Sequence, residues 1–104
     1  MGLLQRIFGL GPKVDLGELI AQGATIVDVR SKAEYAGGHV KGSVNIPLDQ
    51  LSYNLKKFKN KEQAIITCCA SGMRSSSAKG MLKSQGYTNV HNGGSWHNLA
   101  HYGK

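Results

Sequence analysis

The segment Cys69-Ala70-Ser71-Gly72-Met73-Arg74-Ser75 combines a thiol, small polar residues and an arginine in one short loop. It follows the apolar run Ala64-Ile65-Ile66-Thr67 and precedes a segment of helical pattern. Backbone N–H groups of a loop at a helix N-terminus converge on its centre, and with the helix dipole they favour a negative charge there. Because such surroundings lower the pKa of a thiol, we expect Cys69 to be a nucleophilic thiolate.

The other residues of this loop are expected to bind an anionic substrate. Gly72 supplies the positive φ that a tight loop requires, and Arg74 offers a guanidinium to the substrate. The alternative for Arg74 is a framework role, bonded to carbonyls of the loop and to Glu side chains. The hydroxyls of Ser71 and Ser75 either donate to the bound charge or serve as turn formers or helix caps. The predicted substrate-binding residues are Ala70, Ser71, Gly72, Met73, Arg74 and Ser75.

The elements that must position this loop alternate between strand and helix along the chain. Strands are predicted over residues 24–29, 43–46, 64–68 and 88–91, and helices over 16–20, 76–85 and 96–102. A further helix begins at Ser31, with Glu34 completing a capping box, and stops at Gly37-Gly38. Asp49 is expected to cap another helix, with Leu51, Leu55 and Phe58 on one face. The alternation predicts an α/β fold: a parallel sheet of about four to five strands with helices on both faces.

Two blocks of the sequence resemble the rhodanese (thiosulfate sulfurtransferase) superfamily. Cys69-x-x-Gly72-x-Arg74-Ser75 looks like the active-site loop of that family. The N-terminal signature of the family is similar to Ile26-Val27-Asp28-Val29-Arg30-Ser31, Glu34-Tyr35, Gly38-His39-Val40, Gly42-Ser43 and Asn45-Ile46-Pro47. The closing Gly86-Tyr87-x-Asn89-Val90 and Gly93-Gly94-x-Trp96 resemble its last strand and final turn, although the segment around Gly94–Trp96 is short. The likeness covers about residues 14–104, which we expect to form one rhodanese-like domain.

The resemblance implies a single-domain sulfurtransferase that works without a cofactor or metal. Cys69 would attack the sulfane sulfur of thiosulfate or of a persulfide donor and hold that sulfur as a persulfide. The implied partners are a small anionic sulfur donor and a thiol or cyanide acceptor, and an acceptor protein is a further candidate. A non-catalytic rhodanese module that binds a partner or an anion is one alternative, although it would not need both Cys69 and Arg74.

The adjacent cysteines leave a second alternative. Five residues separate Cys68 from Arg74, which resembles the spacing of protein tyrosine phosphatases and rhodanese-fold phosphatases. Four residues separate Cys69 from Arg74. A phosphatase or arsenate reductase would then use Cys68. Gly72 favours the Cys69 frame, because only there does the glycine fall at the position that the rhodanese family has. Cys68 is accordingly expected to be the buried end of the strand.

Composition limits the class of protein further. The 104 residues suffice for one domain, and the net charge of +7 favours anionic ligands. Two adjacent cysteines cannot form a disulfide framework, so a cytoplasmic location is expected. Residues 1–13 are interpreted as an N-terminal arm, and no apolar run is long enough to span a membrane. The run Lys56-Lys57-x-Lys59-x-Lys61 lacks interleaved aromatic residues, which favours a solvated helix face over a nucleic-acid site.

Four side chains outside the loop have competing interpretations. Arg30 either lies near the rim of the pocket or forms a structural ion pair with Asp28 or Glu34. His39 is expected to tie loop backbone together rather than to move protons. His97 and His101 have the spacing of one helix face, which is a weak zinc signal compared with an ordinary polar face.

Overall fold

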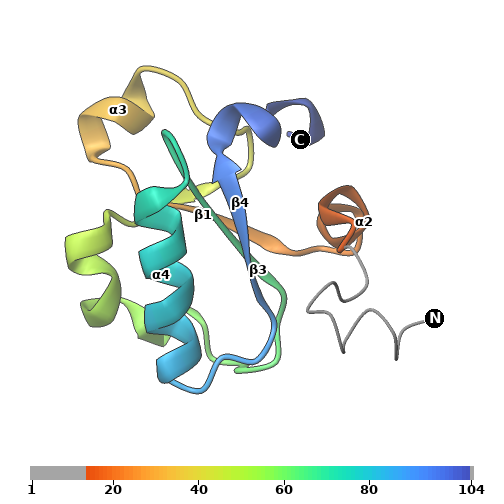
Figure 1. The fold of residues 1–104 in the computed structure, drawn as a ribbon, viewed down its shortest axis with the longest axis vertical. Coiled ribbons are helices and arrows are strands. Elements are labelled where there is room, and N and C mark those ends of the chain that lie inside the picture. Colours follow the sequence, from red (N-terminus) through yellow and green to blue (C-terminus); the bar gives the residue numbers. More distant parts are fainter. Residues whose placement is uncertain (1–13, 104) are drawn as a thin grey trace, which may run out of the picture.

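The computed structural model describes residues 14–103, so the expected arm over residues 1–13 lies outside the described part of the chain. Four strands form one sheet, and every pair of neighbouring strands is parallel. The strand order is β2-β1-β3-β4, with β1 at Thr25–Asp28, β2 at Val44–Asn45, β3 at Ile65–Cys69 and β4 at Val90–Ser95 (Figure 1). The predicted parallel α/β architecture is confirmed.

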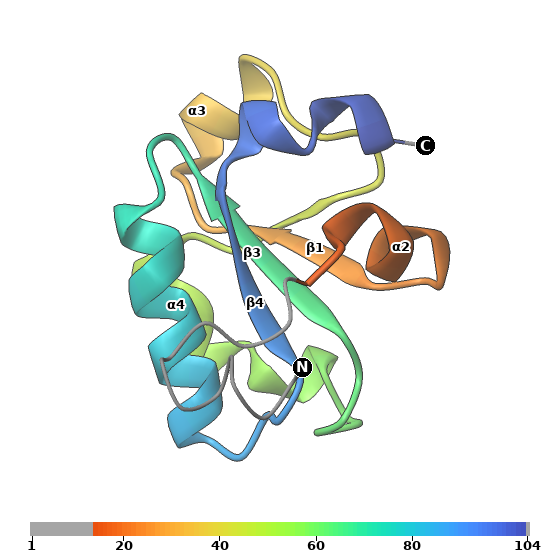
Figure 2. The same ribbon diagram turned by 45° about the vertical axis from the view of Figure 1, so that its right-hand side comes forward.

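Helices cover both faces of the sheet, also as predicted. One face carries α4 (Met73–Ser84) and two short 3-10 helices, η1 (Leu48–Tyr53) and η2 (Leu55–Lys57). The other face carries α2 (Leu16–Ala21) and two more 3-10 helices, η3 (Trp96–Asn98) and η4 (Ala100–Tyr102); Figure 2 shows α2 and α4 on opposite sides of β3. Among residues 14–103, no helix has the length and apolar character needed to cross a bilayer.

Side chains of β3 alternate between two separate apolar cores. Ile65 and Cys69 pack in the core under α4, whereas Ile66 and Cys68 pack in the core under α2. This is the period of two that a strand imposes. All four side chains are fully buried. Consequently, β3 directs its two adjacent thiols to opposite sides of the sheet.

Helix α3 (Lys32–Ala36) shows how local sequence sets an element boundary. The Ser31 hydroxyl accepts the backbone N–H of Glu34, and the Glu34 carboxylate accepts the backbone N–H of Ser31. The predicted capping box is therefore confirmed. The helix ends at Gly37, also as predicted. The capping places Glu34 at the carboxyl edge of the sheet, where β1 leads into α3.

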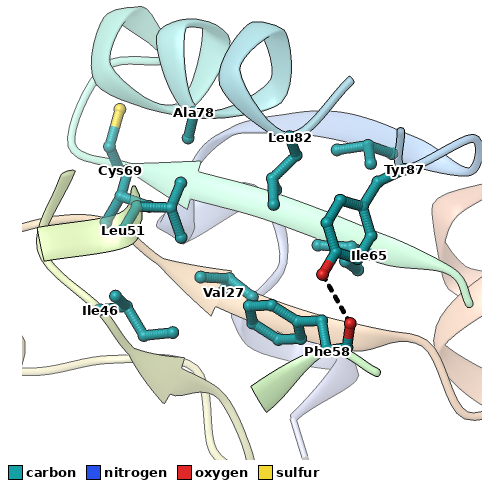
Figure 3. Packing of buried hydrophobic residues seen from close by; sticks show 11 residues of the cluster. Val27, Ile46, Leu51, Phe58, Ile65, Cys69, Ala78, Leu82 and Tyr87 are labelled. Atoms are coloured by element: carbon teal, nitrogen blue, oxygen red, sulfur yellow. Dashed lines mark hydrogen bonds between the residues drawn. The ribbon is translucent and has the colours of Figure 1, made fainter. Parts of the chain in front are cut away.

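The helix predicted to begin at Asp49, with Leu51, Leu55 and Phe58 on one face, is wrong, because the chain forms η1 and η2 there. Asp49 does not cap η1, whose N-cap is Pro47 without a side-chain hydrogen bond. The expected apolar face is nevertheless present: Leu51 and Phe58 are buried and Leu55 packs beside them. The Tyr87 hydroxyl donates to the carbonyl of Phe58 at 2.6 Å (Figure 3). The carbonyl oxygen of Leu55 lies 3.1 Å from the same hydroxyl, so Tyr87 satisfies the backbone of this 3-10 segment. This bond to a distant residue left no local signal in the sequence.

Other element boundaries also differ from the prediction. The closing segment is η3 and η4 rather than one helix over 96–102, with buried Leu99 between them. Strand β3 extends to Cys69, and α4 begins at Met73 instead of residue 76. Strand β4 runs from Val90 to Ser95, beyond the predicted end at residue 91. These shifts shorten the loop after β3 to residues 70–72.

Candidate active site

Cys69 is the last residue of β3, and its sulfur points towards the first turn of α4 (Figure 3). The backbone N–H of Gly72 donates to Cys69 Sγ at 2.9 Å, and the N–H of Ser75 donates at 3.4 Å. The Ser75 hydroxyl oxygen lies 3.4 Å from the same sulfur. A helix N-terminus and a side-chain hydroxyl thus surround the thiol with donors, an arrangement that stabilises an anion.

These contacts change the acidity of the thiol. Burial alone would raise the pKa of Cys69, but hydrogen bonds from Ser75, Gly72 and Ser71 outweigh it and lower that pKa below the ordinary value of a thiol. By contrast, burial and the nearby Asp28 carboxylate raise the pKa of Cys68 to about 12. Of the two cysteines, only Cys69 lies in surroundings that favour a thiolate.

The tight loop depends on two glycines from different elements. Gly72 has φ +104° and is the N-cap of α4. A Cβ at this position would approach the Cα of Gly94 to 3.5 Å. Between Thr67 and Cys69, β3 takes two residue steps while β4 takes three, from Asn92 to Ser95. This bulge, at which Gly94 has φ +74°, brings the backbone of β4 against the loop.

Asn92 links the loop to β4. Its Oδ1 accepts the Ser75 hydroxyl at 2.6 Å and the backbone N–H of Gly94 at 2.9 Å, and its Nδ2 donates to the Gly72 carbonyl at 3.3 Å. Thr67 also connects β3 to the first turn of α4, because its hydroxyl donates to the carbonyl of Ser75 at 2.8 Å. Sequence analysis missed both residues. The one available signal was the position of Asn92 directly before the Gly93-Gly94 pair.

Arg74 lies on the first turn of α4 and forms a bidentate ion pair with Glu34 of α3. Its Nη1 lies 2.7 Å from Glu34 Oε1, and its Nη2 lies 2.9 Å from Oε2. The hydrogen bonds from Arg74 and Ser31 lower the pKa of Glu34 to about 2. The side chains are 38% and 37% exposed, so the pair remains open to solvent and to a ligand.

A surface cavity of about 350 Å³ adjoins this ion pair. Arg74 and Ser31 line it, together with Asp49 and the apolar side chains of Val29, Pro47 and Leu48. It therefore lies where the carboxyl end of β1 meets the start of α4. Open parallel sheets bind ligands at this edge.

The remaining loop residues have different surroundings. Ala70 and Ser71 are exposed, and Met73 is 79% exposed on the first turn of α4. Ser75 is fully buried inside α4, so it is not a helix cap. The structure thus places Gly72 and Ser75 against the sulfur, and Arg74 beside the cavity.

Arg30 is a framework residue and not part of the pocket rim. Its guanidinium donates to both carboxylate oxygens of Asp28, with the Nη2 to Oδ2 distance at 2.7 Å, and to the Gly38 carbonyl at 2.7 Å. Its Cζ lies 4.8 Å from the centre of the Trp96 ring. Asp28 is fully buried and Arg30 is 4% exposed. The predicted ion pair with Asp28 is confirmed.

The histidines take part in local contacts. His39 Nδ1 lies 2.7 Å from the Tyr35 carbonyl oxygen, at the end of α3, and its ring stacks on the Tyr35 ring. This matches the expected backbone-tying role. The rings of His97 and His101 pack against Trp96 and Tyr102. Within the described range 14–103, no three His, Cys, Asp or Glu side chains are grouped so as to hold a metal ion.

Fold and site together define an α/β protein with a thiol surrounded by backbone N–H donors at the carboxyl edge of a parallel sheet. A model of the rhodanese-like domain matches residues 13–98. Thiosulfate sulfurtransferase PspE of Escherichia coli (strain K12) is 33% identical over 75 residues, which cover 71% of this chain and 72% of that protein. The human thiosulfate:glutathione sulfurtransferase is 32% identical over 92 residues, covering 75% of this chain and 80% of that protein.

Solved structures agree with these sequence matches. A structure of a rhodanese with anions from E. coli superposes with a TM-score of 0.71 at 32% identity, and covers 75% of this chain and 93% of that one. The human single-domain sulfurtransferase TSTD1 superposes with a TM-score of 0.69 at 28% identity, and covers 83% and 89%. The chain therefore belongs to the rhodanese family and has the rhodanese fold.

Proposed function

We propose that this protein is a sulfurtransferase that carries sulfane sulfur on Cys69 from thiosulfate or a persulfide donor to a thiol or cyanide acceptor. The observation that carries the proposal is the set of N–H donors on Cys69 Sγ, from Gly72 at 2.9 Å and Ser75 at 3.4 Å. The sulfurtransferase names of two relatives support the same chemistry. An activity that depends on a free thiol fits a reducing compartment, and we place the protein in the cytoplasm.

Loading would proceed by attack of the Cys69 thiolate on the outer sulfur of thiosulfate. The new bond joins Cys69 Sγ to that sulfur, the S–S bond of thiosulfate breaks, and its electron pair leaves with sulfite. The negative charge passes to the outer sulfur of the persulfide. A thiolate needs no general base, and the N–H donors on Cys69 Sγ favour that charged state. In the second half-reaction, the acceptor attacks the outer sulfur and the thiolate of Cys69 is restored.

Arg74 would attract the anionic group of the donor and later the departing sulfite. Its position beside the cavity, on the first turn of α4, supports this role. A guanidinium and the N-terminal N–H groups of one helix both favour negative charge, which suits a dianionic donor. The residues proposed to bind substrate remain Ala70, Ser71, Gly72, Met73, Arg74 and Ser75.

The alternative that uses Cys68 as a nucleophile has no support in the geometry. The Cys68 side chain is fully buried among Ile20, Ile26 and Leu99, on the face of the sheet that α2 covers. Its pKa of about 12 leaves it protonated at neutral pH. No specific observation favours a phosphatase or an arsenate reductase.

Intact mass after incubation with thiosulfate tests the proposal. The wild-type protein should gain one sulfur, roughly 32 Da, and lose it on addition of cyanide with release of thiocyanate. Cys69→Ser should abolish both events. Cys68→Ala is the matched control, because it removes the adjacent thiol without adding a polar group, and it should retain loading. A wild-type protein that gains no sulfur would instead support the non-catalytic binding module.

A further inference from the structure

The Ser75 hydroxyl has one proton and three possible acceptors for it. Asn92 Oδ1 lies 2.6 Å from Ser75 Oγ, the Gly72 carbonyl oxygen lies at 3.1 Å and Cys69 Sγ lies at 3.4 Å. Ser75 is fully buried, so no water competes for the proton. A change in the charge on Sγ must therefore change which acceptor the hydroxyl serves.

The orientation of the Asn92 amide is fixed by its two other bonds. Its Oδ1 accepts the Gly94 backbone N–H, which only an acceptor can do, and its Nδ2 donates to the Gly72 carbonyl, which only a donor can do. A flipped amide would lose both bonds. Asn92 therefore always presents an acceptor, and never a donor, to Ser75.

Counting protons in each state of Cys69 shows what this fixed acceptor does. When Cys69 is a thiolate, Sγ is charged and draws the Ser75 proton, so Ser75 Oγ and Asn92 Oδ1 face each other at 2.6 Å with lone pairs only. When Cys69 carries a second sulfur, the charge moves to the outer atom and Sγ becomes a weak acceptor. The Ser75 proton then returns to Asn92.

We propose that Asn92 is a positioning residue for sulfur loading: its Oδ1 takes the Ser75 proton once charge leaves Cys69 Sγ, and so stabilises the loaded state relative to the free thiolate. This role rests on the proposed sulfur transfer through Cys69. It gives Asn92 two opposite effects, since the same acceptor disfavours the thiolate and favours the persulfide. Asn92 acts through Ser75, and its own hydrogen bonds go to Ser75, Gly72 and Gly94 rather than to Cys69 Sγ.

Replacement of Asn92 by Ala tests both effects. The apparent pKa of Cys69, followed by thiolate absorbance in the ultraviolet without any sulfur donor, should fall because the nearest competing acceptor of the Ser75 proton is gone and only the Gly72 carbonyl, at 3.1 Å, still competes with Sγ. The loaded fraction at a fixed ratio of thiosulfate to sulfite, followed by intact mass, should favour the free thiol by roughly three- to tenfold, the range that one hydrogen bond supplies. In a Ser75→Ala background, Asn92→Ala should change neither quantity further.

Two more variants separate this role from a merely structural one. Asn92→Asp keeps an acceptor towards Ser75 and adds a negative charge, so the apparent pKa of Cys69 should rise. If both substitutions shift that pKa in the same direction, they disturb the loop as a whole and the proposal is wrong. Asn98→Ala, which removes an exposed amide beside Gly94, should leave the pKa and the loaded fraction unchanged.

Failure of this proposal differs from failure of the proposed function. If the wild-type protein never gains sulfur, the proposed function and the loading role of Asn92 both fall. If the wild-type protein loads normally and Asn92→Ala loads equally well, the role of Asn92 alone is overturned. Equal effects of Asn92→Ala with and without the Ser75 hydroxyl would also overturn it.

Discussion

Replacing Arg74 by Ala tests whether this side chain binds the sulfur donor or only holds the loop in place. Both terminal nitrogens of its guanidinium donate to Glu34, at 2.7 and 2.9 Å, yet 38% of the side chain stays exposed beside the cavity. A charge-assisted hydrogen bond to an anionic donor is worth roughly 1.5–3 kcal/mol. Its loss should lower kcat/KM for thiosulfate by about ten- to a hundredfold.

The variants Arg74→Lys and Glu34→Gln sharpen this test. Lysine at position 74 should recover part of the lost kcat/KM, because it restores a positive charge without the bidentate geometry of the guanidinium. Glu34→Gln removes the carboxylate that competes for Arg74, so KM for thiosulfate should fall. Because the ion pair is more than one-third exposed, the midpoint of thermal unfolding should change little in any of these variants.

The assay is initial-rate transfer from thiosulfate to cyanide, with thermal unfolding followed in parallel. Unchanged kcat/KM in Arg74→Ala would refute substrate binding by this side chain. A clearly lower melting temperature, with equal losses towards charged and uncharged sulfur donors, would show a framework role instead. The pKa of Glu34 is lowered to about 2, so its pairing with Arg74 is present above the ordinary carboxyl range and is lost only as the pH falls towards 2. Kinetics near neutral pH therefore sample the intact pair.

Three other outcomes are expected. Asp28→Ala leaves the buried Arg30 without its carboxylate, so it should lower the free energy of unfolding by about 3–5 kcal/mol in urea titrations; a loss below about 1 kcal/mol would show that the pair is dispensable. Gly72→Ala forces a side chain into φ +104°, which should cost about 1–2 kcal/mol and raise the pKa of Cys69 in ultraviolet titration as the N–H leaves Sγ. Since the pKa of Cys69 is lowered, kcat/KM should stay constant as the pH falls below the ordinary thiol range and should decline only as the Cys69 thiolate protonates. A decline of kcat/KM that begins at the ordinary thiol pKa would contradict the stabilisation of the thiolate by the loop.

Local sequence was sufficient wherever one element sets its own boundary. The capping box of Ser31 and Glu34 needs only residues within one helical turn. It predicted that α3 begins after Ser31 and that Glu34 lies in its first turn. The frame that Gly72 sets predicted that Cys68 is buried, and the structure confirms this burial. The place of the loop between a strand and a helix was also predicted, because the loop follows the apolar run 64–67 and precedes a segment of helical pattern.

Contacts between distant segments had no such signal. Glu34 and Arg74 are 40 residues apart, and nothing in either neighbourhood indicates the other. Asn92 and Ser75 meet only because β4 lies beside β3 and bulges at Gly93-Gly94. The loop itself was predicted too long, because Ser71 and Ser75 were both plausible helix caps, whereas the N-cap of α4 is Gly72 in a left-handed conformation.

The alternation of Cys68 and Cys69 across β3 makes strand register a determinant of chemistry. Asp28 of β1 is in register with Cys68, and Ser95 of β4 is in register with Cys69. A slip of one residue along β3 would exchange the faces of the two thiols. Cys68 would then face α4, while Cys69 would enter the core under α2. A change of register in β3 would therefore exchange the surroundings of the two cysteines without changing either residue. On this sheet, the register of β3 decides which of the two thiols faces the first turn of α4.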